Sequence, residues 1–322
     1  MKDFCVLGAG IAGSTIANLI SKNYSVDVFD KARGPGGRSS SRRFKDKLSF
    51  DHGLQYVSPK NKDFKKFINI LKKKNILKVW KGIHLDFNKK KNFKKKKFIG
   101  KIKNNNISKF LLKKINTKFN STIKKIDFKK KYWLITLENN RKIKYKNIIL
   151  TCPYPQVKAL AKKYLYEKSL FNNVKMIPNI TVIVAFKNSF CGNISSIQFN
   201  EDEIVSWAAN ENSKKRFKTN LCLWTIQANF IWSKKYINKY KNNKSKIKNI
   251  LIKKFITKTG FANKNKVYSD IHGWKYAYNL KKTKIKSFWS KKYKLGICGD
   301  WFIGPKAEHA WLSANNLYKK II

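Results

Sequence analysis

The chain has 322 residues and a formal net charge of +56, because 73 residues are Lys or Arg and only 17 are Asp or Glu. A hydrophobic content of 42% excludes a disordered chain and is sufficient for one large domain or two intertwined ones. No apolar run reaches the roughly 18 residues that a membrane-spanning helix needs. No signal peptide is recognisable either, so we expect a cytoplasmic protein without a transmembrane segment.

The start of the chain has the pattern of a strand, a helix and a second strand. Phe4–Leu7 and Val26–Phe29 are short apolar runs, and Ile11–Ile20 between them has helical spacing with small residues on its inner side. This order predicts a βαβ unit. A Gly- and Ser-rich loop, residues 34–41, follows, and Phe64–Leu71 again has helical spacing.

The middle of the chain begins with a Lys- and Asn-rich stretch, residues 86–106, which we expect to be an exposed and variable excursion. After it, apolar runs bounded by polar turns predict further strands and helices. The predicted strands are Thr122–Phe128, Trp133–Leu137, Ile148–Thr151, Ile180–Phe186, Ile194–Phe199, Ile204–Ala208, Leu221–Ala228, Val267–His272 and Leu295–Cys298. The predicted helices are Phe110–Phe119, Phe230–Tyr240, Ile247–Thr259 and Ala307–Ile321.

The excess of lysine has two interpretations, binding to a nucleic acid or anionic membrane, or a drift of composition that also enriches Asn and Ile. The lysine clusters do not form one tail or one helix face, so we favour drift and expect no specific nucleic-acid partner. The clusters are Lys72–Lys74, Lys89–Lys91, Lys94–Lys97, Lys129–Lys131 and Lys281–Lys282.

The cysteines and histidines give no sign of a metal site. The five cysteines are odd in number, far apart and without a CxxC pair, which favours buried thiols in a reducing compartment. They are Cys5, Cys152, Cys191, Cys222 and Cys298, and the equally scattered histidines are His52, His84, His272 and His309.

A glycine motif opens the predicted βαβ unit, with Gly8, Gly10 and Gly13 in the GxGxxG spacing between strand and helix. Gly8 permits a tight turn, Gly10 lets a pyrophosphate approach the backbone, and Gly13 permits close packing of helix on strand. The N–H groups of Ile11–Ala12 and the helix dipole would then face the phosphates. Asp30 ends the second strand, where a carboxylate can accept the hydroxyls of an adenosine ribose.

A second motif, Arg33–Ser39, contains the sequence GGR and is similar to a segment of FAD proteins of the amine-oxidase superfamily. In that family the loop runs along the pyrophosphate and ribityl chain of FAD. Arg38 could pair with phosphate as a fork of donors. The resemblance implies cofactor contacts from Lys31, Arg33, Gly36, Gly37 and Arg38, and from Ile123 in a later strand.

Two further segments resemble bacterial renalase-like flavoproteins of the same superfamily. Phe50–Tyr56 resembles a stretch that passes near the flavin, and Gly296–Ser313 resembles the C-terminal signature of that group. The resemblance implies FAD contacts from His52, Gly53, Gly299, Asp300, Ala310 and Trp311. Weaker matches are Thr151–Gln156, Trp207–Asn210, Asn212–Lys214, Trp232–Ser233 and His272–Ala277. His309 departs from the pattern, since the family commonly has Gly there.

These motifs predict an α/β protein with a discontinuous Rossmann-type FAD-binding domain and an inserted mixed α+β substrate domain. The FAD-binding domain would comprise residues 1–60, 107–160 and 285–322, and the substrate domain residues 61–106 and 161–284. No cysteine lies in a context like that of the family's covalent flavin attachment, so FAD is expected to be non-covalent.

The resemblance implies an oxidoreductase in which a hydride passes from a substrate carbon to flavin N5 and oxygen takes the electrons. The renalase-like group implies isomeric dihydro forms of NAD(P) as substrate. Oxidation of an amine or a carotenoid-like lipid is the alternative, and a basic nucleic-acid or anionic-surface binder on a vestigial flavin fold is the alternative from another class. His52, Gln55 and His272 are candidates for orienting the substrate. Five further aromatic residues could either line the substrate cavity or belong to the hydrophobic core. They are Tyr56, Trp207, Trp224, Trp274 and Tyr276.

Overall fold

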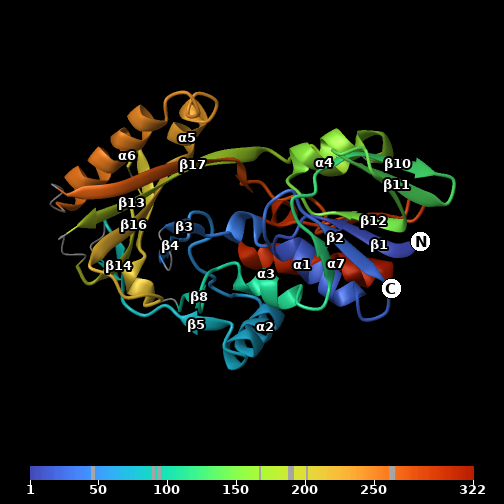
Figure 1. Cartoon of the computed structure of the whole chain (residues 1–322), viewed down its shortest axis with the longest axis horizontal. Coiled ribbons are helices and arrows are strands. Elements are labelled where there is room, and N and C mark those ends of the chain that lie inside the picture. Colours follow the sequence, from blue (N-terminus) through green and yellow to red (C-terminus); the bar gives the residue numbers. More distant parts are fainter. Residues whose placement is uncertain are drawn as a thin grey trace.

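The computed structural model describes residues 1–44, 48–88, 91–92, 96–166, 168–187, 192–200, 202–260 and 265–322. Two lobes lie side by side, each built on its own large sheet (Figure 1). The lobe at the right of Figure 1 holds both termini, and the lobe at the left carries α5 and α6 on its outer face. The cysteine at 191 and the lysines at 89, 90, 94 and 95 lie outside the described residues.

The first lobe has a parallel sheet in the strand order β9-β2-β1-β12-β19. Its strands are β1 (Lys2–Leu7), β2 (Val26–Phe29), β9 (Asn116–Lys118), β12 (Lys142–Leu150) and β19 (Leu295–Ile297). The hairpin β10 (Ile123–Lys129) and β11 (Tyr132–Leu137) pairs with the first half of β12, and β18 (Phe288–Ser290) pairs with β19. β1 is buried between two neighbours, as its continuous apolar run predicts.

Helices cover one face of this sheet and share one hydrophobic core. They are α1 (Ile11–Ile20), α2 (Lys62–Lys73), α3 (Asn106–Leu111) and α7 (Ala307–Ile321). α2 shows how local sequence makes such a helix. The side chain of Asn61 accepts N–H bonds at its start, Lys72 and Lys73 complement the dipole at its end, and Phe64, Ile68 and Leu71 are buried on one face. On the other side of the sheet, α4 (Tyr154–Ala161) packs over a second core that contains Trp133 and Trp301.

The second lobe has a seven-stranded sheet in the order β17-β13-β16-β15-β14-β6-β7. Its strands are β6 (Ile83–Asp86), β7 (Lys91–Asn92), β13 (Met176–Lys187), β14 (Ile194–Gln198), β15 (Val205–Asn210), β16 (Leu221–Ala228) and β17 (Lys266–Asn279). α5 (Phe230–Tyr236) and α6 (Lys244–Thr259) pack on one face over an apolar core. The opposite face points toward the first lobe, and small pairs β3 (Arg42–Phe44) with β4 (Leu48–Phe50) and β5 (Leu77–Val79) with β8 (Phe98–Gly100) lie between the lobes.

The predicted α/β fold with a Rossmann-like unit and an additional mixed sheet is confirmed. The predictions Ile11–Ile20, Val26–Phe29, Leu221–Ala228 and Ala307–Ile321 match the observed bounds. The predicted helix Phe110–Phe119 is wrong beyond Leu111, because α3 ends there and Asn116–Lys118 is β9, an edge strand that pairs with β2. The boundaries of the two domains stay a prediction, although α2, assigned to the substrate domain from the sequence, packs in the core of the first lobe.

Three of the described cysteines, Cys5, Cys152 and Cys298, are free thiols, whereas Cys222 is disulfide-bonded, so the expectation of thiols throughout is wrong there. Among the described residues no helix is long and apolar enough to cross a membrane. Nor do their His, Cys, Asp and Glu side chains form a group of three or more that could hold a metal ion.

Candidate functional site

The glycine motif forms a tight turn at the carboxyl end of β1. Gly8 has φ of +110°, and a Cβ added there would lie 2.5 Å from Oγ1 of Thr151. A Cβ on Gly13 would lie 1.8 Å from the carbonyl oxygen of Gly8, so α1 can approach β1 only with glycine at this position. Gly10 caps α1 without any side chain, which leaves the first turn of the helix open.

The amino end of α1 and Asp30 have hydrogen-bonding groups that no side chain of the first turn occupies. No side chain caps the first turn of α1, and no acidic residue lies in it, so the N–H groups of Ile11–Ala12 and the helix dipole can face a phosphate. Asp30 accepts N–H bonds from Ala9 at 2.7 Å and Ala32 at 2.8 Å, and its carboxylate has further lone pairs for ribose hydroxyls. The N–H of Ser121 donates to the carbonyl of Asp30, which brings the start of β10, with Ile123, beside this position.

The second glycine loop lies directly on the first. The N–H of Gly36 donates to the carbonyl of Ala9 at 2.9 Å, and a Cβ on Gly37 would lie 3.4 Å from Cα of Gly10. Gly36 and Gly37 have positive φ values of +125° and +52°, which side chains rarely adopt. The neighbouring Lys31 and Arg33 are exposed at the surface, and their predicted contacts with FAD stay a prediction.

Arg38 joins this loop to the C-terminal motif. Its guanidinium donates to both carboxylate oxygens of Asp300, at 2.5 and 2.9 Å, and to the carbonyl of Ala277 at 2.7 Å. The N–H of Gly299 donates to Oγ of Ser313 in α7. The motifs at the two ends of the chain therefore meet at one point, and Arg38 and Asp300, predicted as separate contacts with FAD, bind each other.

At the start of α7 the predicted cofactor contacts have different surroundings. The ring of the partly buried Trp311 packs against Phe64 and Phe67 of α2, and the neighbouring Ala310 is buried. His309 Nδ1 is buried without a hydrogen-bond partner among the described residues, and a Cβ on Gly304 would lie 2.9 Å from it.

The face of the second sheet that points toward the first lobe carries a row of polar and aromatic side chains. Residues directly opposite one another across five neighbouring strands share one face of the sheet. From β14 to β17 they are Gln198, Trp207, Gln227, Thr181 and His272. We call these five residues the polar row. The opposite face of the same strands is apolar and lies under α6.

The segment Asp51–Gln55, which we call the central turn, connects this row to the glycine loops. The N–H of Leu54 donates to the carbonyl of Arg38 at 2.9 Å, and Gln227 donates to the carbonyl of Gly53 at 2.8 Å. A Cβ on Gly53 would lie 2.1 Å from the carbonyl oxygen of Arg38. Continuous backbone contacts therefore run from the amino end of α1, through the second glycine loop and the central turn, to the polar row.

His52 lies at the centre of an aromatic group on this turn. Its ring is 4.9 Å from that of His272 and 5.1 Å from that of Trp274, whose indole N–H donates to the carbonyl of His52. A narrow gap without room for a water molecule is lined by Arg42, His52, Thr181, Ile183, Asp270, Ile271 and His272. Tyr56 follows on the same segment, and its ring lies 5.6 Å from that of Trp207.

Both histidines are neutral near pH 7. Burial, with help from His272 and Arg42, lowers the pKa of His52 to about 3. Burial and the same arginine lower the pKa of His272 to about 4. Nδ1 of His52 and Nε1 of Trp207 are buried and have no hydrogen-bond partner among the described residues, so each can bond to a ligand.

Two predicted site residues have other functions in the structure. Trp224 lies on the far face of the sheet, with its ring 5.1 Å from that of Phe255 in α6, so it is core and does not line the space between the lobes. The amide of Gln55 is occupied at both ends, because Nε2 donates to the carbonyls of Asp51 and Gly53 and Oε1 accepts from Lys214. Tyr276 is half-buried on β17, and its contact with a substrate stays a prediction.

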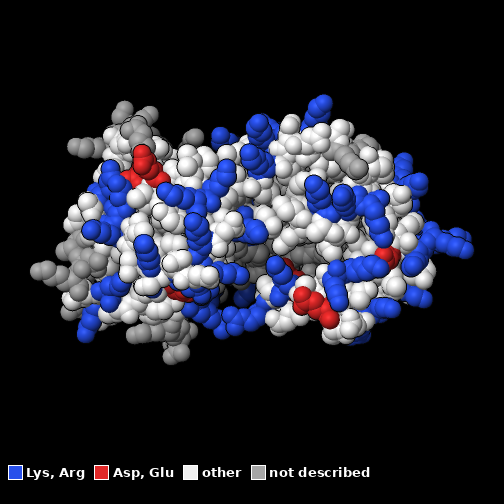
Figure 2. Space-filling model, turned by 90° about the horizontal axis from the view of Figure 1, so that it is seen from above, with Lys and Arg blue, Asp and Glu red and all other residues white. Residues whose placement is uncertain are grey.

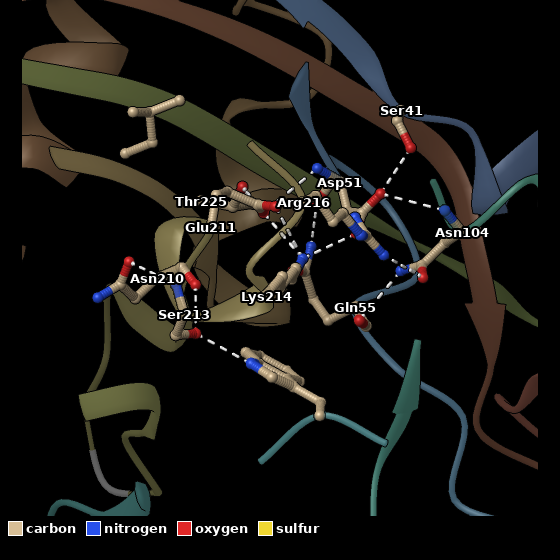
Figure 3. Close-up of polar contacts among 12 residues, drawn as sticks. Ser41, Asp51, Gln55, Asn104, Asn210, Glu211, Ser213, Lys214, Arg216 and Thr225 are labelled. Carbon is tan, nitrogen blue, oxygen red and sulfur yellow. Dashed lines mark hydrogen bonds and ion pairs between the residues drawn. The ribbon is translucent and has the colours of Figure 1, made fainter. Parts of the chain in front are cut away.

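The sequence analysis missed a buried network of charges beside the central turn (Figure 3). Lys214 Nζ lies 2.8 Å from Asp51 and 2.9 Å from Glu211, and Arg216 lies 2.5 Å from Asp51. We call these four residues the buried quartet, and their side chains are at most 2% exposed. Asp51 and Lys214 lie in segments that carry the family resemblance, but nothing in the pattern of a lysine-rich chain marks one lysine as buried.

The quartet perturbs its own carboxyl groups in opposite directions. Burial alone would raise the pKa of Asp51, but Lys214 and Arg216 hold that pKa well below its usual range. Burial raises the pKa of Glu211 despite Lys214, and the neighbouring Asp51 adds to the effect. Asp51 is therefore the main counter-ion of both cations.

Comparisons with known proteins agree with this geometry. Residues 6–71 match the family described as an NAD(P)-binding Rossmann-like domain. A protein of Exiguobacterium sp. 255-15 assigned as a protoporphyrinogen oxidase superposes with a TM-score of 0.76 at 8% identity, covering 99% of this chain and 98% of its own. Two engineered variants of putrescine oxidase superpose with TM-scores of 0.68 and 0.67 at 10% identity, again covering 99% and 98%. At these identities the likeness shows the fold.

Proposed function

We propose that the chain is an FAD-dependent oxidoreductase that binds FAD non-covalently between its two lobes. One observation carries the proposal: an open helix end at Gly10 and a polar row containing His272 are joined by continuous contacts through Arg38 and Gly53. An elongated dinucleotide needs a phosphate site at one end and a walled space for its reactive ring at the other.

The residues present fit such a cofactor. A Cβ at Gly8 or Gly13 would collide with neighbouring atoms, whereas Gly10 has only the carbonyl oxygen of Gly36 within 4 Å, at 3.8 Å. The backbone at Gly10 is thus open to a pyrophosphate. Asp30 would take the ribose hydroxyls, and Arg38 with Asp300 would hold the middle of the cofactor.

FAD, when bound, would supply the redox chemistry of hydride transfer from a substrate carbon, with oxygen as the final acceptor. The chain's own residues would bind and orient the substrate. His52 and His272 stay neutral because burial lowers the pKa of each, so they can donate or accept hydrogen bonds without adding charge. The indole N–H of Trp207 is a second unpaired donor for a substrate carbonyl.

Non-covalent attachment is supported by the state of the thiols. Burial raises the pKa of Cys152, which follows β12 in the first lobe, to about 12. Cys298 and Cys5 are also buried and their pKa values are also raised. A thiol of this kind is a poor nucleophile toward a flavin.

The proposed substrate is an isomeric dihydro form of NAD or NADP, as the likeness to renalase-like sequences suggests. The space-filling view supports an anionic substrate, because Lys and Arg border a hollow between the lobes (Figure 2). A carboxamide on the nicotinamide ring would match the unpaired polar atoms of Trp207 and His52.

The alternatives receive less support. The structural relatives include enzymes named for putrescine and protoporphyrinogen, so amine or other oxidation stays an alternative. Tyr56 and Trp207 are tilted by 41°, however, and do not form the parallel sandwich expected around an amine. For a polyanion-binding protein, Lys and Arg should form one continuous patch, but in Figure 2 they are spread over both lobes of the visible face.

An anaerobic absorbance titration of the purified protein tests the proposal. We expect a yellow protein that releases FAD on denaturation and bleaches when 2- or 6-dihydronicotinamide adenine dinucleotide is added. A yellow protein that is not bleached by these nucleotides would exclude the proposed substrate but would still be a flavoprotein. A colourless protein that cannot be reconstituted with FAD would overturn the proposed function.

A further inference from the structure

The buried quartet has no simple explanation as a stabilising feature. Removing two carboxylates and two cations from water costs several kcal/mol per ion, and well-packed apolar residues often give equal or greater stability. The groups come from segments far apart in the sequence, since Asp51 follows β4 whereas Glu211, Lys214 and Arg216 follow β15. What the quartet contacts is therefore more informative than its charge balance.

The quartet holds the central turn from its two ends. At the first end, the carboxylate of Asp51 accepts hydrogen bonds from Lys214 and Arg216. The backbone N–H of Asp51 donates to Glu211 Oε1 at 3.2 Å. At the other end, Lys214 donates to Oε1 of Gln55 at 3.2 Å. Lysine has no acceptor, so this contact also fixes which end of the Gln55 amide is which.

Arg216 extends the same network through Asn104. Arg216 donates to Oδ1 of Asn104 at 3.0 Å, and Nδ2 of Asn104 donates to the carbonyls of Leu54 and Gln55 at 2.6 and 3.0 Å. Figure 3 shows Lys214 between Asp51 and Glu211, and Arg216 on the side of Asn104. All five residues of the turn are thus bonded by side chains outside it, with Trp274 on His52 and Gln227 on Gly53.

The imidazole of His52 is the polar side chain of the turn that has no hydrogen-bond partner among the described residues. His52 is 6% exposed, its carbonyl is held by Trp274, and its Nδ1 has no hydrogen-bond partner among the described residues. The imidazole borders the same gap as Thr181 and His272, and its ring lies 4.9 Å from the ring of His272. The turn therefore presents one unsatisfied group to the space between the lobes.

We infer that Lys214 is a positioning residue that, with Asp51 and Gln55, orients His52 toward the flavin and substrate. The inference rests on the proposed function and names residues for it. Lys214 itself contacts no ligand in this scheme, because its donors are taken by Asp51, Glu211 and Gln55. The ligand group that His52 would meet is a neutral hydrogen-bonding group, such as a ring N–H, carbonyl or carboxamide.

The test separates positioning from charge balance. Lys214→Met alone leaves two carboxylates with one arginine, so it tests stability only. Lys214→Met combined with Glu211→Gln removes one charge of each sign and keeps the pair of Asp51 with Arg216. His52→Ala gives the signature of a lost imidazole. Lys254→Met, which removes a partner of Asp202 at the surface, is the matched control.

Three quantities are measured on each variant: the melting temperature, the visible circular dichroism of bound FAD, and the rate of bleaching by 6-dihydronicotinamide adenine dinucleotide. We expect the double variant to recover most of the melting temperature lost in Lys214→Met. The dichroism of FAD in the double variant should still differ from that in the unsubstituted protein. This difference should have the same sign as the difference that His52→Ala causes. Any bleaching should slow roughly tenfold, the size expected when one buried hydrogen bond is lost.

If both the melting temperature and the dichroism of the double variant return to the values of the unsubstituted protein, the inference is overturned. The quartet would then serve only to balance its own charges. If the double variant does not fold, Gln55→Met is the deciding variant, because it keeps all four charges and removes the contact with Lys214. Unchanged dichroism of bound FAD in Gln55→Met would then overturn the inference. Absence of FAD from the unsubstituted protein is a different result, which overturns the proposed function and with it this inference.

Discussion

The glycine loops of the first lobe and the central turn between the lobes are built in opposite ways. In the loops the backbone forms the site. Gly8, Gly10 and Gly13 permit close approach of the backbone because they have no side chain. At the turn the backbone is held by side chains from distant segments, and Asp51 is surrounded by three other buried charges. A backbone site can be read from local spacing, whereas a site built from distant side chains depends on the whole fold.

The largest difference should appear when a carboxylate is neutralised in each environment. Asp51→Asn leaves Lys214 and Arg216 buried with only Glu211, so the free energy of unfolding should fall by about 3–5 kcal/mol. The control Asp127→Asn also removes a carboxylate with two lysine partners, but at the surface, and should cost about 0–1 kcal/mol. Urea unfolding of both variants measures the contrast, and equal losses would mean that burial of the quartet has no energetic effect.

Acid should weaken the central turn before it affects the glycine loops. Burial lowers the pKa of His52 to about 3 and that of His272 to about 4, so the unfolded chain takes up protons near its ordinary histidine pKa of about 6.5 and the folded chain does not. Stability is therefore lost as the pH falls from about 6.5 toward 4, by about 2 kcal/mol for each histidine between about pH 7 and pH 5.

Urea midpoints at these two pH values measure this effect, with His272→Asn as the comparison. Burial lowers the pKa of His52, His84 and His272 alike, so removal of one of these three groups should flatten the pH dependence by about a third. An unchanged dependence in His272→Asn would show that another group is responsible, for which His84 is the first candidate because burial also lowers its pKa, to about 4.

A single methyl group distinguishes two glycines of the first lobe. Gly13→Ala places Cβ 1.8 Å from the carbonyl oxygen of Gly8, which should cost about 1–3 kcal/mol and weaken FAD binding. Gly34→Ala meets no atom within 4 Å and has ordinary φ, so it should leave both quantities unchanged. Flavin fluorescence titration with thermal unfolding gives the two readouts. Equal FAD affinity in the two variants would contradict the assigned turn.

The smallest expected effect compares two tryptophans on opposite faces of the second sheet. Trp207→Phe removes an unpaired buried N–H that faces the first lobe, and it should raise the KM for the dihydronicotinamide probe a few-fold, by about 1 kcal/mol, with little change in stability. Trp224→Phe shrinks the core under α6 and should lower stability without changing KM. Steady-state kinetics would contradict the assignment if Trp224→Phe had the larger effect on KM.

The sequence by itself determined the features whose cause is local. The spacing of Gly8, Gly10 and Gly13 between an apolar strand and a helix fixed the βαβ unit, because steric clashes and dihedral limits act over a few residues. The same holds for α7 and for the central strands, whose apolar runs are long enough to decide their type.

Only the tertiary structure decided what depends on strand pairing and on distant side chains. Strand register placed Trp207 toward the first lobe and Trp224 under α6, although both are tryptophans in apolar strands. The sequence of a lysine-rich chain does not show that Lys214 is buried beside Asp51, nor that Gln55 bonds to Lys214. The partners of this buried charge are more than 150 residues away along the chain. Local sterics can be read along the chain, and electrostatic partnership requires the fold.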